Sequence, residues 1–353
     1  MEYRRFGKTG WNVAVNGFGT WQFSSTWSGS TDEGNIDAMK AFLDAGGNFI
    51  DTADVYGAGH SESLVKEAIE EWRKSRRAGG ADDADRRIYV VTKSGRAHGD
   101  AANPLSSAPH GDQNYQEDAL RAAVAASSRR LGVETLDLVL MHCPPTETLR
   151  KGALFDILRT LVKEGKIAHW GVSVETVDEA LLCSAQPDCA AIEIIFNCLR
   201  LKPAEDFFPL ARTADVGIIV RVPLASGLLT GKINAEYLAS LAQTDHRTFN
   251  KSGDFFDKGE TWSGLGEHLE NAAFPAVEAI RALVPEGTTM AAFALRWILM
   301  FPDVSVVIPG MRTREHVAGN LVAAALPSLS DEAMDGVRQA YDKHVREIVH
   351  GSW

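Results

Sequence analysis

Cysteines, apolar spans and targeting signals are scarce or missing in this sequence. It has only four cysteines in 353 residues, too few for a disulfide scaffold, and none forms the close pairs that structural zinc favours. We therefore expect reduced thiols and a cytoplasmic location. No apolar core follows the first charged residues, so we expect no signal peptide. No apolar run approaches the roughly 20 residues that cross a bilayer, so we expect no membrane partner.

Basic charge is also in short supply. The chain has 36 lysines and arginines against 47 aspartates and glutamates, which gives a formal net charge of −11. A surface of this sign repels phosphate backbones, so we expect no nucleic-acid partner, and a phosphorylated ligand needs a local basic site. The rest of the composition, with 45% hydrophobic and 24% charged residues, is ordinary for a soluble globular protein.

Strands that alternate with helices can form either a closed barrel or an open, doubly wound sheet. The open sheet typically has a Gly-x-Gly-x-x-Gly turn after an early strand. The sequence has no such turn at such a position. Instead, short apolar runs alternate with helical patterns. The runs that read as strands span residues 15–19, 49–51, 88–92, 136–141, 167–172, 190–196, 217–222 and 304–308. Eight strands alternating with helices predict an α/β fold, a parallel sheet closed into a (β/α)8 TIM barrel.

Further segments complete the predicted architecture. Residues 2–5 and 11–14 flank a Gly-Lys-Thr-Gly turn and predict an N-terminal hairpin that plugs the bottom of the barrel. Long loops at 96–113 and 229–267 follow the third and seventh strands, at the C-terminal face where barrels of this kind build their sites. Because no linker interrupts the pattern, we expect one domain over residues 1–353.

Four polar side chains lie at or just beyond predicted strand ends. Asp51 ends the second strand, Lys93 follows the third and His142 follows the fourth, while Tyr56 lies five residues beyond Asp51. The ends of adjacent parallel strands converge on one mouth of a barrel. Each residue alone has an ordinary structural explanation, but their joint arrival at three adjacent strand ends predicts a catalytic site.

These residues, in this order and in these local contexts, resemble the catalytic tetrad of the aldo-keto reductases. The likeness covers nearly the whole chain and includes Gly-Phe-Gly-Thr-Trp at 17–21 and Ile-Pro-Gly-Met-Arg at 308–312. It implies an oxidoreductase that transfers a hydride between NADPH and the carbonyl of an aldehyde or ketone, reversibly with the alcohol. The implied catalytic residues are Asp51, Tyr56, Lys93 and His142, with Tyr56 as proton donor.

The residue types suit that reaction. Reducing a carbonyl takes a hydride at carbon, which a nicotinamide supplies, and a proton at oxygen. A phenol is a poor proton shuttle at neutral pH because its ordinary pKa is about 10. A neighbouring cation lowers that value, so Lys93 is expected to lower the pKa of Tyr56. Asp51 is expected to hold Lys93 in place, and His142 to donate a hydrogen bond to the carbonyl oxygen.

The resemblance also implies a site for NADPH or NADP⁺ across several strand ends. Its candidate residues are Gly19, Thr20, Trp21, Ser173, Glu193, Arg221, Pro223, Leu224, Ser226, Gly227, Leu228, Lys232, Gly310, Arg312, His316 and Asn320. Glu193 stands where the family commonly has Gln, Val174 where it has Asn, and Arg221 where an aromatic ring often stacks on the nicotinamide. Because a buried glutamate needs a partner, we expect Glu193 and Arg221 to pair beneath the ring. The alternative is two unrelated strand-end charges.

The other end of the cofactor has its own candidates. Arg312 matches the family position that meets the 2′-phosphate of NADP, near a helix N-terminus that also favours phosphate. Asn320 matches the adenine contact, whereas His316 and Gly319 depart from the common residues. Segment 245–250 resembles a loop that closes over the cofactor in some bacterial members, and an ordinary surface loop is the alternative.

Candidates for the substrate pocket are Trp21, Tyr56 and His142. Aromatic residues in the long loops are weaker candidates, because such residues commonly pack only on their own loop: Trp27, Phe255, Phe256 and Trp262. The sequence favours no one substrate among sugars, quinones, keto-steroids and microbial or plant toxins. It also leaves open the oligomeric state and the direction of the reaction in the cell.

Two other functions compete with this interpretation. Some members of the family act mainly as cofactor-binding regulatory subunits of ion channels and keep the tetrad, although this chain lacks the added N-terminal segment expected of them. A metal-dependent hydrolase would need His and carboxylate ligands clustered at strand ends. One His and one Asp are all that fit, so we expect no metal.

Overall fold

The structure is a computed structural model and describes residues 1–23, 31–96, 113–243 and 245–353. Over these ranges it has eight parallel strands in the spatial order β10-β9-β8-β7-β6-β5-β4-β3, which is their order in the chain. They are β3 (Phe18–Gly19), β4 (Phe49–Asp51), β5 (Tyr89–Ser94), β6 (Leu136–His142), β7 (Ile167–Ser173), β8 (Ala191–Ile195), β9 (Gly217–Arg221) and β10 (Val304–Val307). Parallel bridges Asn16–Val307 and Gly19–Gly310 join the first strand to the last. The predicted (β/α)8 barrel is confirmed.

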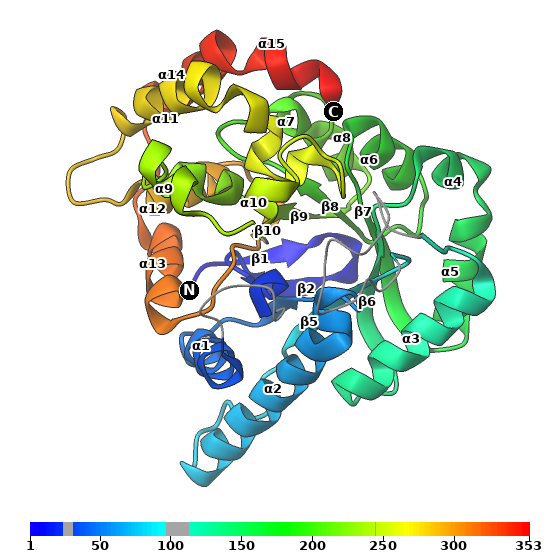
Figure 1. Cartoon of the computed structure of the whole chain (residues 1–353). Helices are drawn as coiled ribbons and strands as arrows, with labels where there is room; N and C mark the ends of the chain where they lie inside the picture. The colour runs from blue at the N-terminus through cyan, green and yellow to red at the C-terminus, as the bar shows by residue number, and fades with distance from the viewer. Residues whose placement is uncertain (24–30, 97–112, 244) are drawn as a thin grey trace.

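Helices surround the strands on the outside (Figure 1). They are α1 (Asp32–Asp44), α2 (His60–Ala78), α3 (Glu117–Leu131), α4 (Thr146–Lys151), α5 (Ala153–Lys163), α6 (Val177–Ser184), α7 (Lys202–Asp206), α8 (Phe208–Thr213), α9 (Ala235–Ser240), α10 (His246–Phe249), α11 (Phe274–Arg281), α12 (Met290–Leu299), α13 (Arg314–Ala325), α14 (Asp331–His344) and α15 (Arg346–Val349). Hydroxyl and carboxylate caps set several starts: Thr176 and Glu179 form a capping box on α6, and Thr313 caps α13.

The N-terminal hairpin forms as predicted from β1 (Tyr3–Phe6) and β2 (Trp11–Ala14), which pair antiparallel. In Figure 1 the hairpin, in blue, lies across the ring of strands. Phe6 and Val13 enter the core inside the barrel, where they join Phe49 and Leu138. A Cβ built on Gly217 would lie 2.7 Å from the Phe6 ring, so only glycine leaves room for this plug.

Several predicted boundaries differ from the observed ones. The first strand is β3 alone, because residues 15–17 join the barrel through single bridges and hydrogen bonds rather than a ladder. Lys93 lies inside β5, one residue before its end. The predicted loop 229–267 holds short helices, including α9 and α10. Most of the loop 96–113 lies outside the described residues.

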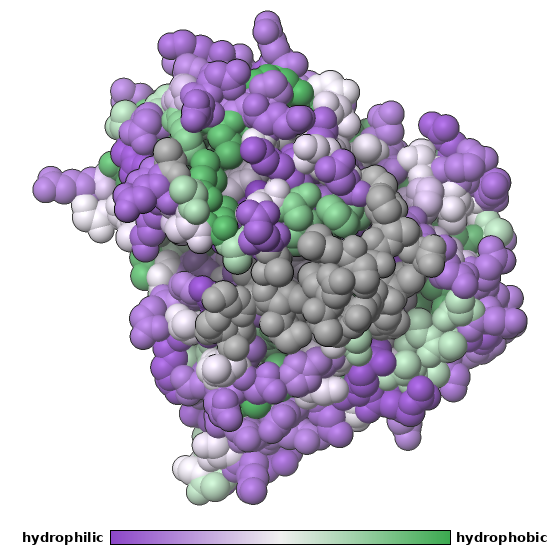
Figure 2. Space-filling model, in the orientation of Figure 1, coloured by the Kyte–Doolittle hydropathy of each residue, from purple (hydrophilic) through white to green (hydrophobic). Residues whose placement is uncertain are grey.

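Figure 2 shows a face dominated by polar residues, with smaller hydrophobic groups between them. Exposed large hydrophobic residues are scattered over the chain, as in Val133, Leu210 and Val322. In the described ranges, no helix combines the length and apolar character required to traverse a bilayer.

Candidate active site

The C-terminal ends of three neighbouring strands bring the predicted tetrad residues together. Lys93 of β5 donates a hydrogen bond to Asp51 of β4, with 2.5 Å from Nζ to Oδ1. Tyr56 opens the turn η3 (Tyr56–Gly59) after β4, and its ring centroid lies 5.3 Å from Lys93 Nζ. His142 ends β6, and its ring meets the Tyr56 ring edge to face at 6.1 Å between centroids. Residues distant in sequence thus share one mouth.

Lys93 is held by more anions than the sequence suggested. Its ammonium lies 3.3 Å from Glu193 Oε2 as well as contacting Asp51, and it donates to the Thr52 carbonyl at 3.3 Å. Burial lowers the pKa of Lys93, but Asp51, Glu193 and Tyr56 outweigh it and raise the pKa above its usual value. Burial and the Glu193 charge also raise the pKa of Asp51 well above its usual range, against the pull of Lys93. The ammonium therefore stays charged at neutral pH.

Tyr56 does not behave as expected from its cationic neighbour. Burial raises the pKa of Tyr56, Lys93 lowers it, and the carboxylates of Asp51, Glu193 and Glu260 raise it again. Lys93 thus lowers the pKa as expected, but the net pKa lies above that of a free phenol. The physical reason is that burial disfavours the charged phenolate by more than Lys93 favours it, and the nearby carboxylates offset the charge of Lys93. The phenol therefore keeps its proton at neutral pH and is ready to donate it.

His142 is neutral at physiological pH. Burial lowers its pKa well below the ordinary value, and Arg96, Lys93 and Arg221 lower it further. The Tyr115 hydroxyl donates to the His142 carbonyl at 2.8 Å, which anchors the end of β6. Among the described residues, His142 Nδ1 has no hydrogen-bond partner. A neutral imidazole carries one N–H, so this ring has a single donor to offer a ligand.

The predicted pairing of Glu193 with Arg221 is wrong. Glu193 contacts Lys93 and accepts a hydrogen bond from Ser173 Oγ at 3.1 Å. Arg221 instead pairs with Glu260 at 3.1 Å and donates to the Val174 carbonyl at 3.1 Å. The long loop after β9 carries Glu260 over the mouth to the guanidinium, and this contact between distant segments had no signal in the sequence.

The turn after β9, which carries several of the predicted cofactor residues, is strained. Ala225, Ser226 and Gly227 all have positive φ angles, of 49°, 56° and 103°. Side-chain-bearing residues rarely adopt this conformation, and it clusters at ligand sites. Ser226 Oγ donates to the Glu260 carbonyl and accepts from the Trp262 amide, both at 3.0 Å. Pro223, Leu224 and Leu228 lie in the same turn, which continues as η5 (Ala225–Thr230).

Basic groups gather where α13 begins. Burial lowers the pKa of His316, and Arg312 and Lys232 lower it further, which places both cations near that imidazole. This is a local basic site against the acidic background of the chain. Close by, Asn320 Nδ2 donates to the carbonyl of Gly310 at 3.4 Å. The predicted residues at this end of the cofactor site are therefore brought together.

The predicted residues after β3 are largely committed to packing. Gly19 donates its N–H to the Pro309 carbonyl at 3.2 Å, next to Gly310. Thr20 is fully buried, and its hydroxyl donates to the Asp51 carbonyl at 3.0 Å. The Trp21 ring packs against the His246 ring at a tilt of 56°, with ring centroids 4.7 Å apart. His246 opens α10, so segment 245–250 does reach the mouth of the barrel.

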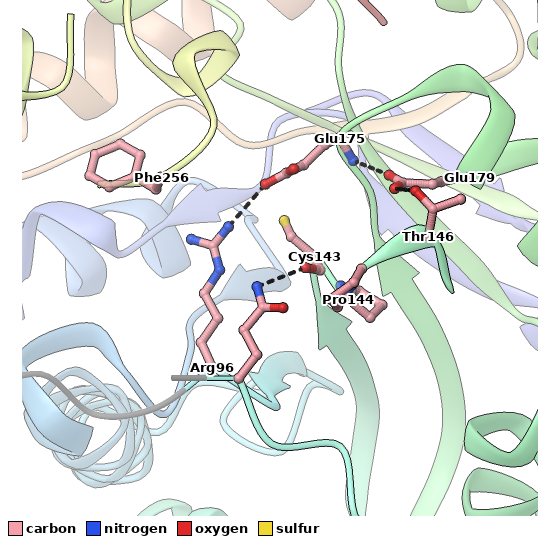
Figure 3. Close-up of a pocket in the computed structure, with 9 residues that line it drawn as sticks. Arg96, Cys143, Pro144, Thr146, Glu175, Glu179 and Phe256 are labelled. Carbon is pink, nitrogen blue, oxygen red and sulfur yellow. Dashed lines mark hydrogen bonds and ion pairs between the residues drawn. The ribbon is translucent and has the colours of Figure 1, made fainter. Parts of the chain in front are cut away.

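A cavity of about 240 Å³ opens beside this cluster (Figure 3). It is lined by Arg96, Gln113, Cys143, Pro144, Pro145, Thr146, Glu175, Glu179 and Phe256. Phe256 is the one weaker aromatic candidate that lines it. Trp262 is fully buried and bonds to the Arg247 carbonyl of its own loop, Phe255 packs on Phe249, and Trp27 lies outside the described residues.

The sequence reasoning missed the polar wall of this cavity. Arg96 follows Lys93 by three residues, and Glu175 follows Ser173 by two. Both therefore come just after strands whose ends had already been identified, and that position was the available signal. Gln113 lies at the end of a long loop, Thr146 begins α4 and Glu179 lies in the first turn of α6, and none of these positions gave a signal.

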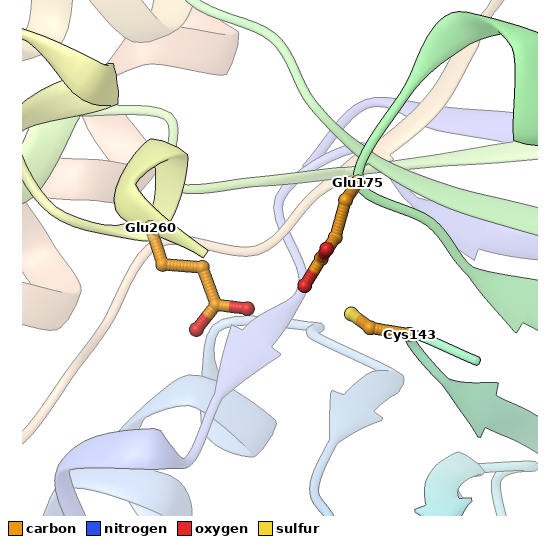
Figure 4. Close-up of side chains that lie close together, drawn as sticks. All are labelled: Cys143, Glu175 and Glu260. Atoms are coloured by element: carbon orange, nitrogen blue, oxygen red, sulfur yellow. The ribbon is translucent and has the colours of Figure 1, made fainter. Parts of the chain in front are cut away.

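Charged residues from loops form a second cluster above the first. Arg96 Nη2 lies 3.3 Å from both Glu175 and Glu260, and Arg221 pairs with Glu260 as well. Cys143, Glu175 and Glu260 point toward one another, with ligand atoms all within 4.8 Å (Figure 4). Two guanidiniums already neutralise these carboxylates, and burial raises the pKa of the Cys143 thiol to about 12. Protonated sulfur is a poor metal ligand.

Comparisons with known proteins give the family and the fold of the chain. The model of the Aldo/keto reductase family matches residues 17–342. Aldo-keto reductase YhdN of Bacillus subtilis is 28% identical, covering 88% of this chain and 85% of that protein. The NADH-specific methylglyoxal reductase of Escherichia coli is 28% identical over 92% and 94%. A probable voltage-gated potassium channel subunit beta of Arabidopsis thaliana is 26% identical over 96% of each.

Solved structures show the same fold. The holo form of an aldo-keto reductase from Bacillus halodurans aligns with a TM-score of 0.74, 22% identity and coverage of 96% of both chains. An aldo/keto reductase from Klebsiella pneumoniae in complex with NADP and acetate aligns with a TM-score of 0.64 and 22% identity, over 96% of this chain and 95% of that one. On the match over residues 17–342, the chain belongs to the aldo/keto reductase family.

Proposed function

We propose that this chain is an NADP(H)-dependent oxidoreductase that interconverts a small polar aldehyde or ketone and its alcohol. The observation that carries the proposal is the buried Asp51–Lys93 pair at 2.5 Å, set 5.3 Å from the ring of a protonated Tyr56 and opposite a neutral His142. A proton donor and a neutral hydrogen-bond donor beside a fixed cation are what carbonyl reduction needs.

Each residue has a distinct task in this proposal. Tyr56 gives its proton to the carbonyl oxygen as negative charge develops there. Lys93 stabilises the phenolate that is left, and Asp51 fixes the ammonium through their short hydrogen bond. His142 donates its single N–H to the same oxygen and orients the carbonyl. In the reverse direction the phenolate takes the proton of the alcohol.

The described residues fit a nicotinamide cofactor, which when bound supplies or accepts the hydride. Glu193 Oε2 is buried and accepts no hydrogen bond from the described residues, so it is available to a carboxamide N–H. The strained turn at 225–227 suits a pyrophosphate. Arg312, with Lys232 near the start of α13, suits a 2′-phosphate. The Klebsiella relative is in complex with NADP, whereas the Escherichia coli relative is NADH-specific. Our preference for NADP(H) therefore rests on the 2′-phosphate contact that we propose for Arg312.

Trp21, Tyr56 and His142 do not line the cavity, but Cys143 in its wall directly follows His142, so we take the cavity as part of the substrate site. Its volume of about 240 Å³ is below the 300–1,000 Å³ typical of pockets for drug-sized ligands. Arg96, Gln113, Thr146 and Glu175 give it a polar wall. Small hydrophilic carbonyl compounds therefore fit better than quinones or steroids. Two related proteins, a methylglyoxal reductase and a glycerol dehydrogenase from Gluconobacter oxydans, carry names of small polar compounds.

The direct test follows NADPH absorbance with a panel of small aldehydes, keto-alcohols and bulky ketones. Wild type and Tyr56→Phe are compared, with NADH in parallel. We expect turnover of the small compounds with NADPH and a loss of at least about a hundredfold in kcat for Tyr56→Phe. Cofactor affinity should be unchanged in that variant, because the hydroxyl acts on the substrate.

Two results would contradict the proposal. Turnover that survives Tyr56→Phe would remove the phenol from the chemistry. Tight NADPH binding without turnover of any carbonyl would favour a regulatory role, in line with the similarity to a potassium channel beta subunit.

A further inference from the structure

The buried ion cluster at the mouth holds one carboxylate more than it needs. Lys93 lies between Asp51 and Glu193, at 2.5 Å and 3.3 Å, and all three side chains are at most 3% exposed. One of these carboxylates is enough to neutralise the ammonium. The second gives the group a net negative charge when all three are ionised, and burial together with this excess charge raises the pKa of Asp51. A cation brought to the group would relieve the excess.

One carboxylate oxygen of Glu193 has no hydrogen-bond donor among the described residues. Its Oε1 accepts from Ser173, while Oε2 makes an ion contact with Lys93 but accepts no hydrogen bond from the described residues. A buried carboxylate oxygen without a donor is costly, because a desolvated acceptor normally has a partner. A ligand with an N–H group would complete it.

The position of that ligand follows from the proposed chemistry, on which this inference rests. A hydride donor must come within about 3.5 Å of the carbonyl carbon whose oxygen accepts the proton of Tyr56. The Tyr56 ring centroid lies 5.3 Å from Lys93 Nζ, and Glu193 contacts the same nitrogen. The proposed chemistry therefore puts the nicotinamide ring on the side of the mouth where Lys93 and Glu193 lie.

Oxidised and reduced nicotinamide differ in charge. The oxidised ring carries one positive charge and the reduced ring carries none, so a nearby fixed charge acts on the two forms unequally. We propose that Glu193 is a specificity-determining residue that selects the oxidised cofactor, and so biases this enzyme toward alcohol oxidation. In that direction the alcohol carbon loses a hydride to the cofactor, the hydroxyl loses its proton to solvent through Tyr56, and the carbonyl forms.

Other charges at the mouth do not cancel this effect. Arg221 is the next cation, but its ion pair is with Glu260, and Arg96 is divided between Glu260 and Glu175. Burial raises the pKa of Glu175 to about 7, so above that pH these four residues hold two positive and two negative groups. The excess carboxylate therefore stays with the Lys93 cluster.

Binding affinities test the proposal without turnover. The dissociation constants of NADP⁺ and NADPH, and of NAD⁺ and NADH in parallel, are measured by titration calorimetry for wild type and Glu193→Gln. Glutamine keeps the shape and the carboxamide contact but removes the charge. A unit charge at about 5–6 Å and an effective dielectric constant of about 20 should change the reduced-to-oxidised Kd ratio by roughly one hundred- to three hundredfold. We expect the variant to lose that preference for the oxidised form.

Two further variants separate charge from shape. Glu193→Asp keeps the charge and retracts it, so it should lose affinity for both forms while keeping the preference of wild type. Glu179→Gln removes a carboxylate elsewhere on the same mouth and keeps the cap of α6, so it should leave the ratio unchanged. Circular dichroism and thermal melting check that each variant folds.

The outcomes are distinguishable. An unchanged ratio in a folded Glu193→Gln that binds both forms would overturn the inference and leave the proposed function intact. Loss of the preference in Glu193→Asp would overturn it as well, since the charge is retained there. Failure of wild type to bind any nicotinamide form would overturn the proposed function and this inference with it.

Discussion

Two charged clusters meet at the mouth of the barrel and differ in how they are held. Asp51, Lys93 and Glu193 stand on β4, β5 and β8, within ladders that pair residue by residue. Arg96, Glu175 and Glu260 stand on loops, and Glu260 comes from a segment far along the chain. The first cluster is at most 3% exposed, whereas the loop side chains reach 27%.

This difference separates chemistry from access. A side chain on a barrel strand is positioned by the backbone hydrogen bonds of its neighbours, so its geometry survives loop motion. A side chain on a loop is positioned only while the loop stays closed. The strand cluster is therefore suited to fixed proton chemistry, and the loop cluster to closing and opening the mouth. Substitutions in the strand cluster should therefore lower stability and kcat, whereas substitutions in the loop cluster should mainly change loop protection and KM.

The largest effect is expected for Lys93→Met. It leaves two buried carboxylates without their cation, and removing one partner of a buried pair costs about 3–5 kcal/mol. Urea unfolding should show that loss, and kcat should fall by at least about a hundredfold. Lys66→Met, at an exposed lysine with a distant helical partner, is the control. A variant as stable and active as wild type would show that the strand cluster contributes neither to stability nor to catalysis.

A smaller effect is expected for Glu260→Ala in the loop cluster. Arg221 loses its ion pair and Arg96 keeps only Glu175, which should cost about 1–3 kcal/mol. The loop after β9 should then be cut faster in limited proteolysis, with KM changed more than kcat. Glu267→Ala, at an exposed position of the same loop, should be cut like wild type. Equal protection in both variants would contradict the role of Glu260 as the contact that closes the loop.

The loop cluster should also titrate near neutrality. Burial and Asp257 raise the pKa of Glu175 from 4.5 to about 7, against the pull of Arg96. The folded chain therefore binds more protons than the unfolded chain between these values, so stability falls as pH rises through this window and is level above it. Glu175→Gln should remove a decline on the order of 1–3 kcal/mol, measured by urea unfolding from pH 4 to pH 8. An identical pH profile in the variant would refute this.

The smallest effect is expected outside both clusters. Arg312→Gln should weaken NADPH binding about tenfold and leave NADH binding unchanged, because it removes one charged contact to phosphate. Arg314→Gln is the matched control, since that exposed arginine pairs with Asp37 on the surface. Equal loss of NADPH and NADH affinity in Arg312→Gln would show that the residue acts on the fold rather than on the 2′-phosphate.

Much of the fold could be predicted because its signals are local. Strand lengths, helix caps and the alternation of elements depend on near neighbours in sequence, and the hairpin and barrel followed from them. The ends of β4, β5 and β6 could be predicted to meet, since parallel strands in chain order deliver their ends to one face. The first strand was overestimated, because an apolar run does not reveal how many of its residues will find a ladder partner.

The partners of Glu193 and Arg221 could not be predicted. Their choice depends on distances between β8, β9 and a loop segment some forty residues later, which no spacing in the sequence encodes. The raised pKa of Tyr56 could not be predicted from the sequence either. A neighbouring lysine lowers the pKa of a phenol, but burial and the number of carboxylates around that lysine decide the sign.

By itself, the sequence determined the barrel, the set of residues at its mouth and the kind of reaction they suit, because strand order and residue type are written along the chain. The tertiary structure alone decided which charges neutralise one another. Glu193 came to Lys93 and Glu260 to Arg221 because electrostatic pairing depends on distance and burial, and both exist only once the chain has closed on itself.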